Sequence, residues 1–127
     1  MSIPPSPLAL AEQLFVISRP TVIAFFPPVT QEQLEHDSAT NESLADFQIY
    51  VKQARERLAK LGIELKAVYA RSFRISIAGK VTTFRPGSQD VGYYLIAPGR
   101  TPRIEYGVET DDDLVQLSAE CFGAREP

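Results

Sequence analysis

Residues 21–35 read TVIAFFPPVTQEQLE. The run from Thr21 to Phe26 is β-branched, aromatic or small, which is typical of a strand covered on both faces of a sheet. A proline pair at positions 27 and 28 interrupts this run, because proline has no amide hydrogen to donate. The polar residues that follow favour a helix. Many α/β proteins place functional residues where a strand ends and a helix begins, so the first question is what Thr30 to Gln33 do.

The middle of the chain adds a second strand and a long helix. Apolar residues at steps of three and four predict a helix over Asn41–Leu61, with Ser43 and Asp46 as its capping box and Gly62 at its end. The residues Ile63–Ala70 predict a strand. A strand, a helix and a strand in this order favour a right-handed crossover between two parallel strands.

The remaining segments complete an α/β pattern. Alternating residues predict a hairpin over Phe73–Phe84 and an antiparallel pair, Gly92–Ala97 and Arg103–Val108. Three aspartates near the start of Thr110–Gly123 predict a closing helix. At the other end, Ser6-Pro7 is a typical helix start and predicts a short helix over Leu8–Ile17. Residues 1–5 are expected to be extended or disordered.

Composition excludes several kinds of partner and site. The 127 residues are expected to form a single domain over residues 1–127, and a net charge of −3 makes nucleic acid an unexpected partner. One cysteine and one histidine exclude an internal disulfide and a multi-cysteine or histidine-rich metal site, so no metal and no cofactor are expected.

Localisation is inferred from what the sequence lacks. No signal peptide or membrane span is predicted, and the absence of disulfides favours the cytoplasm. The alternative is a periplasmic or exported protein whose leader has been removed. A monomer or a weak homodimer is expected.

The order of elements resembles the thioredoxin-like superfamily, in which a βαβ unit is followed by a ββα unit on one mixed sheet. TVIAFFPP before a helix is similar to the first strand and active-site turn of thioredoxins and peroxiredoxins, and VGYYLIAPGRTPRIEYG is similar to the later strand, turn and strand. The resemblance covers about Leu8 to Gly123. It implies an α/β three-layer sandwich, with a central mixed sheet of four to five strands flanked by helices.

The expected reactive residues are missing. At thioredoxin spacing, the two cysteines fall at Thr30 and Gln33, and the peroxidatic cysteine of a peroxiredoxin also falls at Gln33. The cis-proline of the superfamily would lie near Val91, where there is no proline. The resemblance therefore implies a loss of dithiol exchange and thiol peroxidase activity, because no thiolate stands where the fold would activate one. Cys121 lies on the apolar face of the last helix and is expected to pack in the core.

Two groups of side chains are candidates for binding. Glu32 and His36 follow the first strand, although a histidine in a polar loop is usually just solvated. The hairpin region can offer cationic and aromatic groups to an anionic ligand or a protein, through Arg71, Phe73, Arg74 and Arg85. The alternative for the hairpin is that its charges point outward and its aromatic rings enter the core.

The sequence therefore favours a redox-inactive thioredoxin-like domain that binds a protein partner or a small anionic ligand. The alternative is a thioredoxin- or peroxiredoxin-related enzyme with non-cysteine or glutathione-type chemistry, using Thr30, Glu32, Gln33 or His36. An enzyme requires an enclosed pocket with a partner acid or base within about 3 Å. A binding domain predicts an open, solvated turn.

Overall fold

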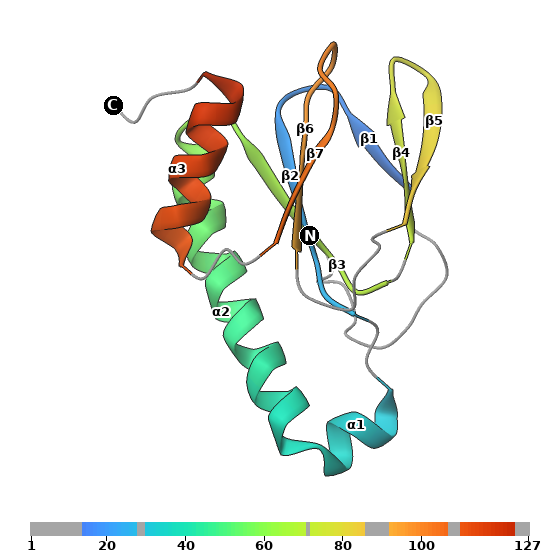
Figure 1. The fold of residues 1–127 in the computed structure, drawn as a ribbon, viewed down its shortest axis with the longest axis vertical. Coiled ribbons are helices and arrows are strands. Elements are labelled where there is room, and N and C mark those ends of the chain that lie inside the picture. Colours follow the sequence, from blue (N-terminus) through green and yellow to red (C-terminus); the bar gives the residue numbers. More distant parts are fainter. Residues whose placement is uncertain (1–13, 28–29, 71, 86–91, 107–109, 124–127) are drawn as a thin grey trace.

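The computed structural model describes residues 14–27, 30–70, 72–85, 92–106 and 110–123. These residues form seven strands and three helices (Figure 1). In chain order they are β1 (Leu14–Ile17), β2 (Thr21–Phe25), α1 (Gln31–His36), α2 (Ser38–Ala59), β3 (Glu64–Val68), β4 (Phe73–Ile77), β5 (Lys80–Phe84), β6 (Gly92–Ile96), β7 (Arg103–Tyr106) and α3 (Asp111–Phe122).

The elements are arranged in three layers. A four-stranded mixed sheet in the order β3-β2-β6-β7 lies in the middle. Helices α2 and α3 cover one of its faces, and a three-stranded sheet in the order β1-β4-β5 covers the other (Figure 1). The predicted α/β class and the central mixed sheet are confirmed. The expected helical flank on the second face is replaced by a sheet.

Strand β2 is the centre of the four-stranded sheet. It pairs in parallel with β3 and antiparallel with β6, and all five of its residues are buried. The chain passes from β2 through α1 and α2 to β3, so the predicted crossover between parallel strands is confirmed. Burial on both faces explains why the run carries no polar alternation.

Strand β1 corrects the prediction of a helix over Leu8–Ile17. Residues 14–17 pair in parallel with β4, and residues 8–13 lie outside the described residues. Within β1, Phe15 and Ile17 pack between the two sheets, whereas Leu14 and Val16 are 47% and 70% exposed. This period of two suits an edge strand, and its pairing with β4 outweighs the expectation that a helix would extend to Ile17. The predicted helix start at Ser6-Pro7 and the expected extended residues 1–5 lie outside the described residues.

Helix α2 begins earlier than predicted. Asp37 is its N-cap and accepts a hydrogen bond from the amide of Thr40 at 3.1 Å. Ser43 and Asp46 lie inside the helix, so the prediction that they form its capping box is wrong. The helix ends at Ala59, and Gly62 follows with the left-handed φ of 75° that was expected there.

The later elements follow the predictions. The β4–β5 hairpin turns through Ala78 and Gly79, whose φ values of 52° and 83° match a two-residue type I′ turn. Strands β6 and β7 pair antiparallel on either side of Gly99, which has a φ of 78°. The last two residues of the predicted strand, Gly107 and Val108, lie outside the described residues. Helix α3 begins after the N-cap Thr110 and ends at Gly123, whose φ is 69°.

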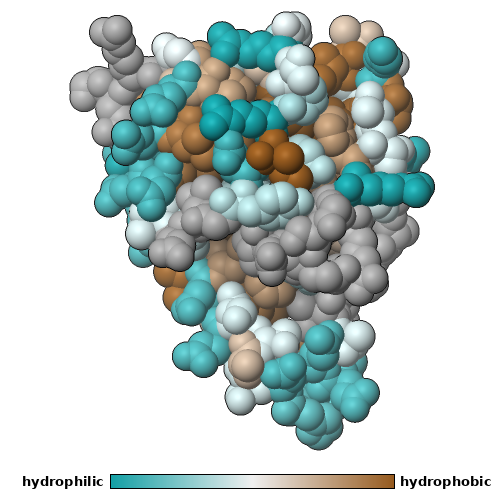
Figure 2. Space-filling view, in the orientation of Figure 1, coloured by the Kyte–Doolittle hydropathy of each residue, from teal (hydrophilic) through white to brown (hydrophobic). Residues whose placement is uncertain are grey.

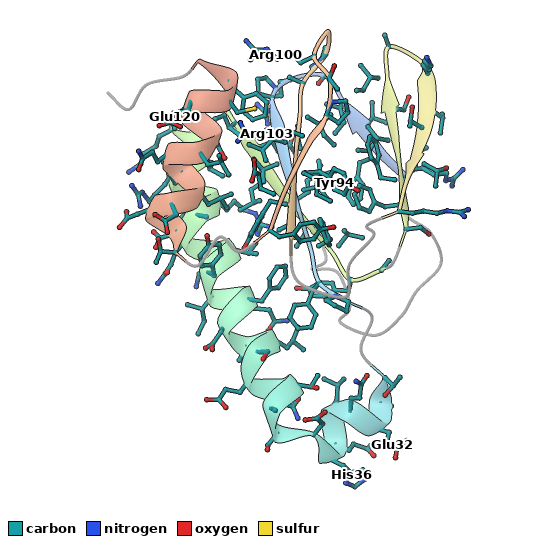
Figure 3. The ribbon with its side chains drawn as sticks, in the orientation of Figure 1. Glu32, His36, Tyr94, Arg100, Arg103 and Glu120 are labelled. Atoms are coloured by element: carbon teal, nitrogen blue, oxygen red, sulfur yellow. The ribbon has the colours of Figure 1, made fainter. Side chains whose placement is uncertain are left out.

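Two hydrophobic clusters lie on the two faces of the four-stranded sheet. The helix-side cluster joins Val22 and Ala24 of β2 to the apolar stripe of α2 and to Leu114 of α3. The sheet-side cluster joins Ile23 and Phe25 of β2 to the inner face of the three-stranded sheet. Aromatic rings make up much of this second cluster, and Tyr94 lies between the two sheets (Figure 3).

Candidate functional site

The turn after β2 is built by a reciprocal pair of hydrogen bonds. Thr30 is the N-cap of α1, and its hydroxyl oxygen accepts from the amide of Gln33 at 3.1 Å. In return, the side-chain oxygen of Gln33 accepts from the amide of Thr30 at 2.9 Å. This is a capping box, which satisfies two helix-end amides at once. The two residues at the expected cysteine positions therefore have a structural role.

A corner held by hydrogen bonds follows between α1 and α2. Asp37 ends the first helix and caps the second, and its carboxylate accepts from the hydroxyl of Thr40 at 2.8 Å. This hydrogen bond from Thr40 lowers the pKa of the Asp37 carboxyl. The side-chain Nδ2 of Asn41 donates to the carbonyls of Leu34 at 2.7 Å and Asp37 at 3.1 Å. Side-chain bonds thus hold the angle between the helices.

This corner projects away from the sheets. Helix α2 has 22 residues and is about 33 Å long, so it extends past the end of the four-stranded sheet (Figure 1). Hydrophilic side chains cover the projecting end (Figure 2). Residues 30–51, which include it, hold five carboxylates, one histidine and no lysine or arginine. We call this segment the acidic arm.

Glu32 and His36 lie at the tip of the acidic arm and point away from the sheets (Figure 3). The side chain of His36 is 75% exposed, and its Nε2 atom is 3.8 Å from a carboxylate oxygen of Glu35. An open depression of about 440 Å³ lies beside them, lined by Glu32, Gln33, His36, Asp37, Ser38 and Ala39. Its walls are polar and solvated, unlike the apolar walls typical of a small-molecule site.

Aromatic side chains fill the place where the parallel strands end. Phe26 follows β2, Tyr69 follows β3, and Phe47 reaches them from α2. Phe47 lies with its ring centroid 5.1 Å from that of Phe26 and 5.9 Å from that of Tyr69. All three side chains are buried. In open α/β sheets ligands usually bind in the crevice at these strand ends, but here three rings occupy that space.

The single thiol lies far from this turn. Cys121 is half-buried near the C-terminal end of α3, packs against the helix-side cluster, and accepts a hydrogen bond from Arg100 through its backbone carbonyl. Arg100 and Glu120 mark this end of the molecule, opposite the acidic arm (Figure 3). Cys121 therefore cannot act on a group held at the turn after β2.

No protein-family model, curated protein or solved structure matches this chain. In the described ranges, no cluster of three histidine, cysteine, aspartate or glutamate side chains is arranged to hold a metal ion. Over the same ranges, none of the helices has both the length and the apolar character needed to cross a membrane.

The hairpin separates its aromatic and cationic residues. Phe73 is fully buried and stacks on Phe84 with ring centroids 5.9 Å apart, so its side chain is not available for surface binding. Arg74 is half-buried on the outer face of β4, and Arg85 is exposed after β5. Arg71 lies outside the described residues, as does Val91, the position of the expected cis-proline. The described aromatic residues thus follow the alternative in which they enter the core.

Strand β5 is the exposed part of the hairpin that the sequence offered as a binding surface. Four successive residues, Lys80 to Thr83, are exposed, including Val81 at 52%. One sequence signal was present: the residues 72–85 contain three basic side chains and no acidic one, in a chain with 16 acidic residues. The edge position of β5 required the strand order, which no local pattern gives.

A pair of tyrosines, the half-buried Tyr50 and the buried Tyr93, joins α2 to the four-stranded sheet. The rings of Tyr50 and Tyr93 lie 6.0 Å apart, and the hydroxyl of Tyr50 donates to the carbonyl of Thr110. Burial raises the pKa of Tyr93 to about 12 and raises that of Tyr50 further above its ordinary value. Both side chains are therefore protonated at neutral pH, and their role is to dock α2 against the start of α3.

Proposed function

We propose that this chain is a redox-inactive thioredoxin-like domain that binds a protein partner or a small anionic ligand. The observation that carries the proposal is the capping box of Thr30 and Gln33. Where the resemblance implies two reactive cysteines, these side chains satisfy the backbone amides that begin α1. A thiolate is required for dithiol exchange, and the described thiol of Cys121 is at the other end of the domain.

The layout of the four-stranded sheet supports the resemblance. A parallel pair, β2 and β3, is joined through helices, and an antiparallel pair, β6 and β7, leads to α3. These are a βαβ unit and a ββα unit on one mixed sheet. The three-stranded sheet on the second face departs from the expected helical flank and supplies a surface that such a flank would not have.

Redox assays test this proposal directly. Insulin reduction and peroxide consumption should remain at the level of a protein-free control for the wild-type chain and for Cys121→Ser. Thiol-dependent turnover that disappears in Cys121→Ser would overturn the proposal. Turnover that survives in Cys121→Ser would also overturn it, because it would require chemistry at another residue.

The second candidate is an enzyme with glutathione-type chemistry at the acidic arm. The depression beside Glu32 and His36 is the observation that favours it. Five carboxylates in the surrounding segment oppose it, because glutathione is itself an anion. Titration with glutathione, followed by the NMR signals of His36, would support this candidate if those signals shift in the wild type, and signals that stay in place would exclude it.

A further inference from the structure

Edge strands expose backbone groups that can pair with another chain. Among the described strands, the two strand orders leave four edges: β1 and β5 on the three-stranded sheet, and β3 and β7 on the four-stranded sheet. The edge at β3 is covered in part, because Arg55 of α2 donates to the carbonyl of Leu65 at 3.1 Å. Strands β1 and β7 also carry exposed residues, but β5 has four in succession, Lys80 to Thr83, and the exposed Arg103 of β7 is already paired with Glu105 of the same strand.

The backbone of β5 has a definite outward-facing set of groups. Its hairpin turn has two residues, Ala78 and Gly79, so the flanking pair Ile77–Lys80 is hydrogen-bonded across the ladder. Hydrogen-bonded and non-hydrogen-bonded pairs alternate in an antiparallel ladder. The amide and carbonyl groups of Val81 and Thr83 therefore point away from β4, toward the free edge. These groups are the ones that an added strand would use.

The charge of the three-stranded sheet favours an acidic partner at the edge of β5. The strands β1, β4 and β5 contain no aspartate or glutamate, although the whole chain has a net charge of −3. Lys80 and Arg85 stand at the two ends of β5 and are exposed. Among the residues that the structure describes, neither of them has an ion-pair partner. Lys80 and Arg85 are therefore available to pair with the carboxylates of an added strand.

We propose that the free edge of β5 binds an extended acidic segment of a partner protein as an added strand. This inference rests on the proposed binding function and names its partner class. The added strand would take its affinity from the backbone groups of Val81 and Thr83, and its preference for acidic sequences from Lys80 and Arg85. Val81 also offers an exposed apolar side chain to the added strand.

A second copy of this chain is a poorer occupant of the edge. Antiparallel pairing of two β5 strands would place Lys80 and Arg85 of both copies along one seam, and like charges oppose such pairing. The acidic arm has the complementary charge, but its residues 31–36 and 38–51 are helical. A helix has no free backbone edge to offer to a strand. The occupant is therefore a different chain with an extended conformation.

Fluorescence anisotropy with a labelled, end-blocked peptide of alternating threonine and glutamate would test the proposal on the full chain. The matched control peptide has glutamine in place of glutamate and should bind about tenfold more weakly. Lys80→Glu should weaken binding of the acidic peptide about fivefold, whereas Lys52→Glu on α2 should leave it unchanged. Added salt should weaken the acidic peptide more than the neutral one.

Thr83→Pro separates edge pairing from a simple charge effect. Proline is tolerated on an edge strand where the amide faces solvent, so the hairpin should persist, as circular dichroism would verify. The variant should bind the acidic peptide about tenfold more weakly, because it lacks an outward amide. Thr83→Val keeps the amide and a β-branched side chain, and it should bind like the wild type.

Each other outcome overturns the inference. If Thr83→Pro binds like the wild type, the peptide is held by charge alone and the edge is not its site. If sedimentation shows a wild-type dimer that Thr83→Pro abolishes, the occupant is a second copy. If the wild type binds neither peptide, the β5 inference fails alone, because the redox assays decide the proposed function separately. Turnover in those assays would remove the proposed function whatever the peptides do.

Discussion

Replacing Gly92 by alanine tests the packing between β6 and β2. A Cβ atom at Gly92 would lie 2.3 Å from Cζ of Phe25 and 3.0 Å from both of its Cε atoms. Carbon atoms in contact are normally about 3.5–4.0 Å apart. The ring of Phe25 is 2% exposed, and the ring centroids of Tyr94 and Tyr106 lie 5.4 Å and 6.0 Å from its own. It therefore has little room to retreat.

Two opposing effects set the expected change in the free energy of unfolding. Overpacking a well-filled core costs about 1–3 kcal/mol. Gly92 does not have a positive φ, so alanine fits its backbone and should recover about 0.4–1 kcal/mol by restricting the unfolded chain. The clash is the larger effect, and the net loss should be about 1–2 kcal/mol. For a chain of 127 residues this corresponds to a decrease in Tm of about 4–8 °C.

A double-mutant cycle followed by urea unfolding measures the clash. Leucine at position 25 lacks the ring atoms that the new Cβ would meet, so Gly92→Ala with Phe25→Leu should be more stable than the two single losses predict, by about 1 kcal/mol. Gly62→Ala is the control: Gly62 has a φ of 75° and nothing within 4 Å of a built Cβ, so its loss should simply add to that of Phe25→Leu. Additive losses for the Gly92 pair would refute the proposed contact.

Three further predictions concern the cap, the tyrosine pair and the β3 edge. Thr30→Ala should lower the free energy of unfolding by about 1 kcal/mol and Thr30→Ser by much less; equal losses in urea unfolding would contradict a capping role. The pKa of Tyr93 is raised from 10.0 to about 12, so the unfolded state loses its proton first and stability should fall as pH rises from 10.0 to about 12. Tyr93→Phe should lose less stability than the wild type over that interval. A wild type whose stability does not change there, or a variant that loses as much as the wild type, would contradict this. Arg55→Ala should lower the free energy of unfolding by about 1 kcal/mol and increase aggregation measured by light scattering, because it uncovers the carbonyl of Leu65. Lys52→Ala should change neither.

Residue patterns predicted most of the elements correctly because their signals are local. Three signals can each be recognised from a few neighbouring residues: the uninterrupted apolar run of β2, the apolar stripe on α2 and the glycines at the turns. Strand β1 could not be predicted in this way, since Leu14–Ile17 is apolar in every position and becomes a strand by pairing with β4, about sixty residues later in the chain. The β5 edge required the same long-range information.

The candidate site illustrates a different difficulty. The spacing of Thr30 and Gln33 matches a capping box as well as it matches the two cysteines of a thioredoxin, and the first of these patterns was available in the sequence. Neither side chain carries a thiol, so neither can take part in dithiol exchange. In the hairpin, the alternation of Phe73 and Arg74 predicted opposite faces but not which face is covered, because a second sheet had to be present to bury the ring.

The position of β2 between two hydrophobic clusters has a consequence for how the domain opens. Val22 and Ala24 belong to one cluster, and Ile23 and Phe25 belong to the other, so neither cluster can separate without exposing the same strand. Hydrogen exchange at the β2 amides should therefore require global unfolding, whereas the α1 amides should exchange through local fraying. The helices and the three-stranded sheet would then behave as a single cooperative unit, although the central sheet lies between them.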